Sequence, residues 1–257
     1  MALKALLIAI RYFDTDCQLD GCHQDADDIA AYLHTTHFTS IHTVVMKDQQ
    51  DDNTFQQPLC PTLENMITQM KLLIASAVPG DTLLVTYSGH GSNMRDTSGD
   101  EKDGRDECLC PVDYATHGML VDDQLRRLLV DPLPDNVKLR VVFDSCHSGS
   151  ALDLPFLWKG NAFAIENDHI KQHCDVVFLS GCKDVQTSAD SAFEHPNGAL
   201  TYALLKTLKS FQQDHKKITW RDMDKQVTKI LKQNQFTQRP QLGLMDKTHL
   251  THVVDLL

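Results

Sequence analysis

The sequence has no hydrophobic run long enough to cross a membrane. Its apolar opening, residues 1–10, contains Lys4 and runs directly into Arg11. The uninterrupted apolar core is therefore too short for a membrane span or a signal peptide. We expect no membrane partner and interpret this opening as a buried first strand.

Basic charge is also scarce. The 257 residues include 24 Lys and Arg against 35 Asp and Glu, a formal net charge of -11. Nucleic acid or an anionic membrane surface would need a concentrated basic face, so neither is expected as the main partner. An acidic protein instead suits cationic partners, such as metal ions and peptides that contain Lys or Arg.

The cysteines lack the spacing of a disulfide framework, and no CxxC motif is present. They are Cys17, Cys22, Cys60, Cys108, Cys110, Cys146, Cys174 and Cys182. We expect free thiols and an intracellular, cytoplasmic location. A zinc site built from Cys22, Cys108 and Cys110 with His23 or His117 is disfavoured, because no CxxC pair would anchor it.

Apolar runs of strand length alternate with amphipathic helical patterns along the chain. Strands are expected at 5–10, 41–46, 82–87, 138–143, 176–179 and 250–256. Helices are expected at 26–33, 63–74, 122–130, 198–211 and 220–231. Continuous apolar runs are typical of parallel strands covered on both faces, so the order predicts one three-layer α/β/α sandwich with a mainly parallel central sheet.

Two segments show neither the apolar runs of strands nor the amphipathic pattern of helices. Residues 92–114 are rich in Asp and Glu, and residues 152–174 have the mixed composition of a surface connection. Long segments of this kind in a compact domain are commonly functional or flexible.

Two of the expected strands end close to reactive side chains. Residues 138–143 lead to Cys146, and residues 82–87 lead to His90. If these strands are parallel neighbours, their ends meet at the sheet edge where ligands bind in open α/β sheets. The imidazole can then take the thiol proton. The alternative is a buried structural thiol and a core histidine.

Five segments, in chain order, resemble the metacaspases, the caspase-like cysteine peptidases of the C14 family. They are YSGHGS at 87–92, CPVDY at 110–114, DSCHSG at 144–149, SGCKDVQTSAD at 180–190 and QRPQL at 238–242. The resemblance implies a caspase-like fold and a single peptidase domain over residues 1–257. Its large part would end at about residue 155, a connection would cover about 156–173, and a small part would cover about 174–257. It also implies a monomer without an organic cofactor.

The resemblance assigns the catalytic roles to the same strand ends. Cys146 would be the nucleophile, and His90 would activate it or protonate the leaving amine. The backbone N–H of Gly91, with that of Cys146, would form the oxyanion hole.

Asp25, Asp144 and Ser88 match the positions that form the family's pocket for the residue before the cleaved bond. Two carboxylates in a partly desolvated pocket require a cation. The implied substrates are therefore proteins or peptides with Arg or Lys before that bond. For Asp25, capping of the following helix is an alternative that is compatible with a pocket role.

The family's calcium ligands match Asp106, Asp122, Asp123 and Asp153, one by one. Several carboxylates provide the hard oxygen ligands that Ca²⁺ prefers, and the resemblance implies that Ca²⁺ activates the enzyme. The alternative is a solvated acidic face in which Asp122 caps a helix. Other acidic residues of the 92–114 segment leave the ligand set open.

The resemblance further implies self-cleavage after Lys159, Lys171 or Lys183, and a compact form without an N-terminal extension.

Three other functions compete with that of a cysteine peptidase. A catalytically silent caspase-fold regulator or scaffold would usually lack the Cys or the His. An Asp-specific caspase would need Arg in its pocket, and a redox or metal-binding α/β protein would need a CxxC motif.

Overall fold

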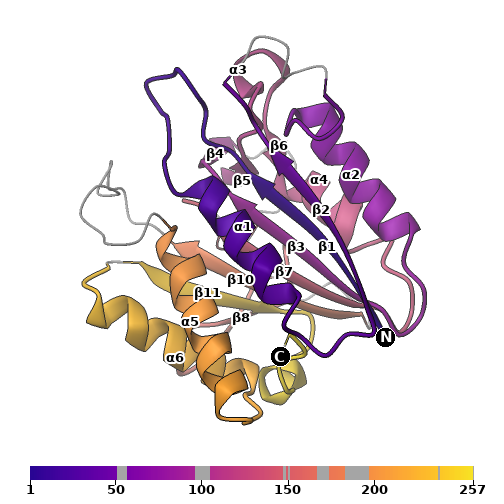
Figure 1. Cartoon of the computed structure of the whole chain (residues 1–257), viewed down its shortest axis with the longest axis vertical. Coiled ribbons are helices and arrows are strands. Elements are labelled where there is room, and N and C mark those ends of the chain that lie inside the picture. The colour runs from indigo at the N-terminus through magenta and orange to yellow at the C-terminus, as the bar shows by residue number, and fades with distance from the viewer. Residues whose placement is uncertain are drawn as a thin grey trace.

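The computed structural model describes residues 1–50, 57–95, 105–146, 149, 151–166, 174–182, 197–236 and 238–256. Within them, an eight-stranded sheet lies between two layers of helices (Figure 1). In spatial order its strands are β2 (Ser40–Lys47), β1 (Ala2–Ala9), β3 (Thr82–Ser88), β7 (Lys138–Asp144), β10 (Asp175–Cys182), β11 (Arg239–Leu244), β8 (Phe156–Trp158) and β9 (Phe163–Ile165). The first five are parallel and the last three are antiparallel to their neighbours. The expected mainly parallel α/β/α sandwich is confirmed.

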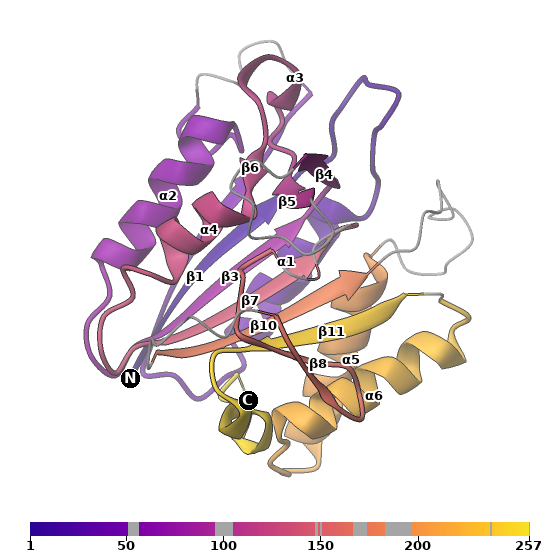
Figure 2. The same ribbon diagram turned by 180° about the vertical axis from the view of Figure 1, so that it is seen from behind.

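Helices cover both faces of the sheet. On one face lie α1 (Cys22–Leu33), α5 (Ala199–Gln213) and α6 (Trp220–Gln233), and on the other lie α2 (Leu63–Ala75) and α4 (Asp122–Leu129) (Figures 1 and 2). Strand β1 shows why two layers are needed: Leu3, Ala5 and Leu7 join one hydrophobic cluster, while Leu6 and Ile8 join the other. Alternate residues of a strand point to opposite faces, so an all-apolar strand requires cover on both. None of the described helices is long and apolar enough to span a membrane.

Local signals place the helix ends close to the expected positions. The Thr62 hydroxyl accepts a hydrogen bond from the Asn65 N–H at the start of α2, and the Thr219 hydroxyl does the same for Asp222 at the start of α6. Each bond satisfies one of the N–H groups that a helix leaves without a partner.

The acidic segment contributes two strands to a small second sheet. Its strands are β4 (Gly91–Arg95), β5 (Arg105–Leu109) and β6 (Leu120–Val121), in the order β4-β5-β6, and the short helix α3 (Tyr114–His117) precedes β6. The sequence pattern does not indicate these strands, because they are short and mostly polar. β4 begins directly after His90, so this sheet borders the candidate site.

The expected last strand at 250–256 is wrong. A 3-10 helix, η3 (Lys247–Thr251), occupies part of it, and Val253 makes only an isolated bridge to Thr219. Leu250 and Val254 are buried, but against the helical layer that includes α6. The free edge of β10 is taken by β11, which the pattern missed because it contains Pro240. Proline has no backbone N–H to donate. Pro240 is tolerated because β8 pairs only with residues 242–244 of β11, so the β11–β8 ladder loses no hydrogen bond at residue 240.

The expected surface connection is partly a pair of sheet strands. β8 and β9 form an antiparallel hairpin beyond β11. Leu157 and Trp158 are buried there, and the Trp158 indole N–H donates to the Asp224 carboxylate at 3.1 Å. Three-residue strands are too short to produce a detectable sequence period.

A buried arginine ties the end of the chain to the sheet. Arg140 on β7 is 2% exposed, and its guanidinium donates two hydrogen bonds of 2.8 Å to Asp255 and one of 2.8 Å to Asp175. Burial opposes ionisation of Asp255, but the charge and hydrogen bonds of Arg140 outweigh it and lower the Asp255 pKa.

We expect Asp255→Asn to lower the free energy of unfolding by about 3 kcal/mol at pH 7, because it leaves the buried Arg140 charge only partly compensated. The pKa of Asp255 is lowered in the folded state, so its contribution is present above the unfolded pKa of about 4 and is lost as the pH falls through the folded value. Urea unfolding at pH 7 and pH 3 measures both effects. The control is Asp214→Asn, which removes an exposed pair with Lys216 and should change stability by less than about 0.5 kcal/mol. Equal effects of the two variants would contradict the role of Arg140.

Candidate active site

The two candidate catalytic residues lie at the carboxyl ends of adjacent parallel strands. β3 and β7 pair in register, with Ser88 opposite Asp144 at their last positions. His90 and Cys146 each follow two residues later. The expected juxtaposition of the strand ends is therefore present.

Gly91 and Cys146 bring the two strand exits into direct contact. A Cβ atom added at Gly91 would collide with the Cys146 backbone carbonyl, so only glycine allows this approach. The Cys110 N–H donates to the His90 carbonyl at 3.1 Å, beside the antiparallel pair of Gly91 and Leu109. Gly91 and Leu109 are therefore a non-hydrogen-bonded pair, in which the backbone N–H and C=O groups of both residues point away from the partner strand. The Gly91 N–H makes no hydrogen bond in the β4–β5 ladder.

The His90 imidazole is fixed by a backbone carbonyl. Its Nε2 lies 2.6 Å from the carbonyl oxygen of Cys17, and its ring stacks at a tilt on Tyr12, with 4.7 Å between the ring centroids. A carbonyl can only accept, so Nε2 bears the proton in the neutral ring. Nδ1 is then the nitrogen with a free lone pair, the state that a general base requires.

Two buried tyrosines support the His90 backbone. The His90 N–H donates to the Tyr12 hydroxyl at 3.0 Å, and the Tyr87 hydroxyl bonds the His90 carbonyl at 2.7 Å. The Tyr12 hydroxyl also donates to the Cys110 carbonyl at 2.6 Å. Burial raises the pKa of Tyr12 and Tyr87 well above 10.0, so both stay neutral hydrogen-bonding groups.

The supporting residues were not predicted from the sequence. Tyr12 lies shortly after the end of β1. Its φ of 55° is uncommon for a residue other than glycine, and only the structure reveals it. The part that Cys17 plays has no sequence signal at all, because any residue supplies a backbone carbonyl.

The cysteines near the site differ in environment. Burial, together with the nearby Cys17 and Cys146 thiols, raises the pKa of Cys110 to about 11. Cys110 therefore remains a thiol at neutral pH, whereas Cys146 is partly exposed at the strand end. None of the cysteine side chains that the structure describes forms a disulfide.

Asp25, Ser88 and Asp144 meet in one buried group beneath the candidate dyad. The Ser88 hydroxyl donates to Asp25, which also accepts the Gly198 N–H at 2.9 Å. Asp144 accepts the Thr201 N–H at 2.9 Å, and its second oxygen has no hydrogen-bond partner in the described part of the chain. The three residues are 1%, 6% and 5% exposed, respectively.

The environment of Asp25 disfavours its charge. Burial is the main cause and the Asp144 carboxylate adds to it, so the Asp25 pKa is raised well above 3.8. A side chain at Gly198 would collide with both carboxyl groups, so the start of α5 packs directly on the pair. The hypothesis that Asp25 caps α1 is wrong, because Gly21 is at the N-cap and Asp25 lies within the first turn.

The four candidate calcium ligands lie around the start of α4. Asp122 and Asp123 open the helix, Asp106 is on β5, and the Asp153 carbonyl accepts a hydrogen bond of 2.7 Å from Arg126 of α4. Burial is the main reason that the Asp122 pKa is raised to about 6, and the charges of Asp106 and Asp123 contribute. Among the described residues, the carboxylates of these four are not gathered tightly enough for three of them to share one ion without movement.

Several sequence predictions fall outside the described residues. They concern Lys171, Lys183 and most of the motif at 180–190.

Comparisons with known proteins identify the family. Residues 3–155 match the family described as metacaspase, peptidase C14 domain. Metacaspase-1 of Mycosarcoma maydis is 33% identical over 288 residues, which cover 93% of this chain and 69% of the relative. Metacaspase-1 of Saccharomyces cerevisiae is 33% identical over 292 residues, with 93% and 66% coverage. The chain thus spans about two thirds of the length of these relatives.

A solved structure supports the fold. The crystal structure of a Geobacter sulfurreducens protein superposes with a TM-score of 0.63 at 24% identity, over 99% of this chain and 98% of that one.

We expect Asp25→Asn to change how stability depends on pH. A carboxyl group whose folded pKa lies above its unfolded value stabilises the protein at low pH and loses that contribution as the pH rises. The wild type should therefore lose stability relative to Asp25→Asn between pH 4 and pH 8, as measured by urea unfolding. The control is Asp28→Asn, one turn further along α1 and also bonded to Asn197. Parallel pH profiles for wild type and Asp25→Asn would contradict the raised pKa.

Proposed function

This chain belongs to the metacaspase family of cysteine peptidases, and we propose that it is a calcium-dependent endopeptidase that cleaves after Arg or Lys. The observation that supports this most is the register of β3 with β7. It sets His90 and Cys146 side by side directly beyond the buried group of Asp25, Ser88 and Asp144. The two strands would thus supply the reactive groups and, with Asp25 of α1, an acidic pocket.

In the proposed reaction, His90 Nδ1 takes the proton of the Cys146 thiol, and the thiolate attacks the carbonyl carbon of the scissile bond. The His90 imidazolium then gives its proton to the leaving amine as the C–N bond breaks. A water molecule hydrolyses the resulting thioester and regenerates the thiol. Throughout, the bond from Nε2–H to the Cys17 carbonyl holds the ring in the required tautomer and orientation.

The developing oxyanion would be stabilised by backbone N–H groups. The Gly91 N–H is free of the β4–β5 ladder and lies beside the Cys146 backbone. Preorganised N–H donors of this kind account for a large part of the rate enhancement in acyl transfer.

The preference for Arg or Lys follows from charge. Two buried carboxyl groups, one of them with an unsatisfied oxygen, would gain a charge-assisted partner from a cationic side chain. The Asn197 amide, which donates to Asp25 at 3.2 Å, would compete with the entering cation. A substrate Asp would add a third acidic group and would be rejected.

Calcium would bind at the start of α4. The donors there are carboxylates, the hard oxygen ligands that suit Ca²⁺, and three of the four residues, Asp106, Asp122 and Asp153, are at most 8% exposed. When bound, Ca²⁺ supplies positive charge that offsets the repulsion among these groups. Asp106 lies on β5, which pairs with β4, the strand that follows His90. Calcium that orders β5 would therefore also order the backbone next to His90.

Self-cleavage is least favourable at Lys159. This residue occupies the β8–β9 turn, where its N–H donates to the Ala162 carbonyl at 2.9 Å and Gly160 has a φ of 80°. A peptidase must bind its substrate as an extended chain, so a tight hairpin resists cleavage. Of the three expected positions, Lys171 or Lys183 is therefore proposed instead.

A catalytically silent scaffold is the second candidate function, and a peptide assay separates the two. We expect the purified protein to hydrolyse fluorogenic peptides with Arg or Lys, but not Asp, before the cleaved bond. Cys146→Ala should reduce kcat at least about 10³-fold, because no other group replaces the nucleophile. Asp144→Asn should lower kcat/KM for Arg peptides at least about 10-fold while sparing the fold.

The matched control is Cys174→Ala, which alters another free, partly exposed cysteine and should leave the rate unchanged. No turnover of any peptide by the calcium-loaded protein would exclude the peptidase. Turnover with an unchanged Arg preference in Asp144→Asn would reject the pocket alone.

We expect Ca²⁺ to activate hydrolysis and EGTA to abolish it. Asp122→Asn should weaken Ca²⁺ binding at least about 10-fold, because it removes the charge of a buried candidate ligand. Protons compete for Asp122, whose pKa is about 6, so calcium affinity should fall as the pH drops below about 6. Calorimetry on the Cys146→Ala background measures the affinity without self-cleavage. Asp135→Asn, an exposed acidic control, should bind normally, and activity that is indifferent to EGTA would refute the metal requirement.

A further inference from the structure

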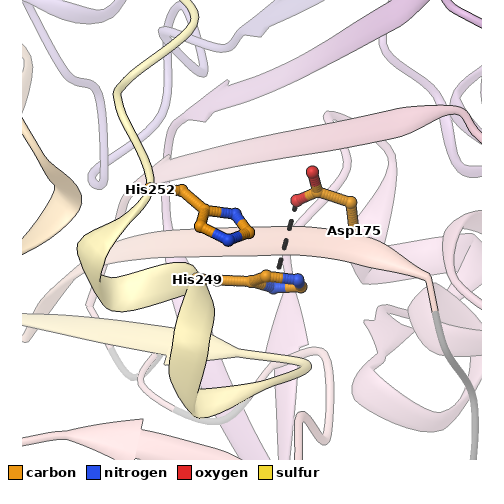
Figure 3. A group of neighbouring side chains, drawn as sticks. All are labelled: Asp175, His249 and His252. Carbon is orange, nitrogen blue, oxygen red and sulfur yellow. Dashed lines mark ion pairs between the residues drawn. The ribbon is translucent and has the colours of Figure 1, made fainter.

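A second group of potential metal ligands lies at the opposite end of the sheet from the dyad. Asp175 begins β10, and His249 and His252 belong to η3 and the residue after it (Figure 3). Their ligand atoms all lie within 4.8 Å of one another. Asp175 pairs with Lys138 at the start of β7, whereas Cys146 follows its end, so the strand length of roughly 20 Å separates the two sites.

The spacing of the two histidines directs both rings to one side. A 3-10 helix repeats every three residues, so His249 and His252 lie one above the other, with 5.0 Å between their ring centroids. His249 Nδ1 faces the Asp175 carboxylate at 3.9 Å, as the dashed line in Figure 3 marks.

The Nδ1 atom of His249 is buried without a hydrogen bond to any described residue. The residue as a whole is 8% exposed. At 3.9 Å, the contact with Asp175 is too long to be a hydrogen bond. A buried polar group left without a hydrogen bond destabilises the fold unless a ligand satisfies it.

The nearby Arg140 does not block a cation. Its charge is met by two hydrogen bonds to Asp255 and one to Oδ1 of Asp175. The oxygen of Asp175 that faces His249 is this same Oδ1, so a bound metal would share the carboxylate with Arg140.

We propose that Asp175, His249 and His252 form a binding site for a divalent transition-metal ion of the zinc class. Two imidazoles and one carboxylate are a ligand set that suits zinc, with water in the fourth position. Ligands about 2.0–2.2 Å from a tetrahedral ion lie about 3.4 Å apart, which small side-chain rotations achieve from the observed separations. The set does not suit calcium, which takes six to eight oxygens.

The site would stabilise the fold instead of taking part in peptide hydrolysis. The metal would link the C-terminal η3 segment to the central strand β10, next to the Arg140 network that already anchors Asp255. An ion that binds only the folded chain raises the melting temperature by an amount that grows with the logarithm of its concentration divided by its Kd.

The test is a Zn²⁺ titration of the full chain with Cys146→Ala, in excess Ca²⁺ to saturate the acidic site. Equilibrium dialysis should give one tightly bound Zn²⁺, and Zn²⁺ should raise the melting temperature. His252→Gln should weaken this binding at least about 10-fold and remove the thermal shift, while its metal-free melting temperature stays unchanged because the side chain is exposed. His117→Gln, an exposed histidine on α3 at the other end of the molecule, is the matched control and should bind as before (Figure 1).

A second measurement identifies the ligands. Co²⁺ in place of Zn²⁺ should give the visible absorption of a tetrahedral site with nitrogen and oxygen ligands, and Asp175→Asn should weaken it. The proposal is overturned if His252→Gln and His117→Gln bind Zn²⁺ equally, or if the Co²⁺ spectrum shows thiolate ligands. Neither readout depends on peptidase activity, so failure here is distinct from failure of the proposed enzyme.

Discussion

The parallel, in-register pairing of β3 with β7 is the constraint on which the candidate site depends. Ser88 and Asp144 are register partners at the strand ends, and both strands are buried along most of their length. A slip of one residue would turn every side chain of a strand to the other helical layer, at the cost of its whole apolar face. Hydrophobic burial in the two layers therefore fixes the position of Cys146 relative to His90.

Carboxyl groups lie at both ends of this sheet, and their charges are compensated differently. At the amino end, Asp255 and Asp175 are neutralised by Arg140 from within the chain. At the carboxyl end, no described Lys or Arg side chain pairs with Asp25 or Asp144, and the Asp25 pKa is raised. The carboxylates at the amino end are thus compensated by a cation from within the chain, whereas Asp25 and Asp144 are not compensated in this way within the described residues.

The regular parts of the fold were predictable because each had a local signal. The buried parallel strands are continuous apolar runs, and α2 and α6 have capping threonines. Prediction failed where tertiary context decides: β11 contains Pro240, β8 has three residues, and the apolar residues after Met245 pack as a 3-10 turn. Each of these depends on which sheet edge is already occupied, and local sequence does not contain that information.

The amino-acid sequence alone was enough to indicate the family, the sheet and the chemical types at the strand ends, because motifs and apolar periods are local properties. It could not show that the His90 ring bonds the Cys17 carbonyl or that the His90 N–H bonds the Tyr12 hydroxyl. Nor could it show that the Gly198 N–H bonds Asp25. It also could not bring Asp175 to His249 and His252. Those contacts join residues far apart in the chain, and they exist only because packing the two hydrophobic layers closes the intervening loops.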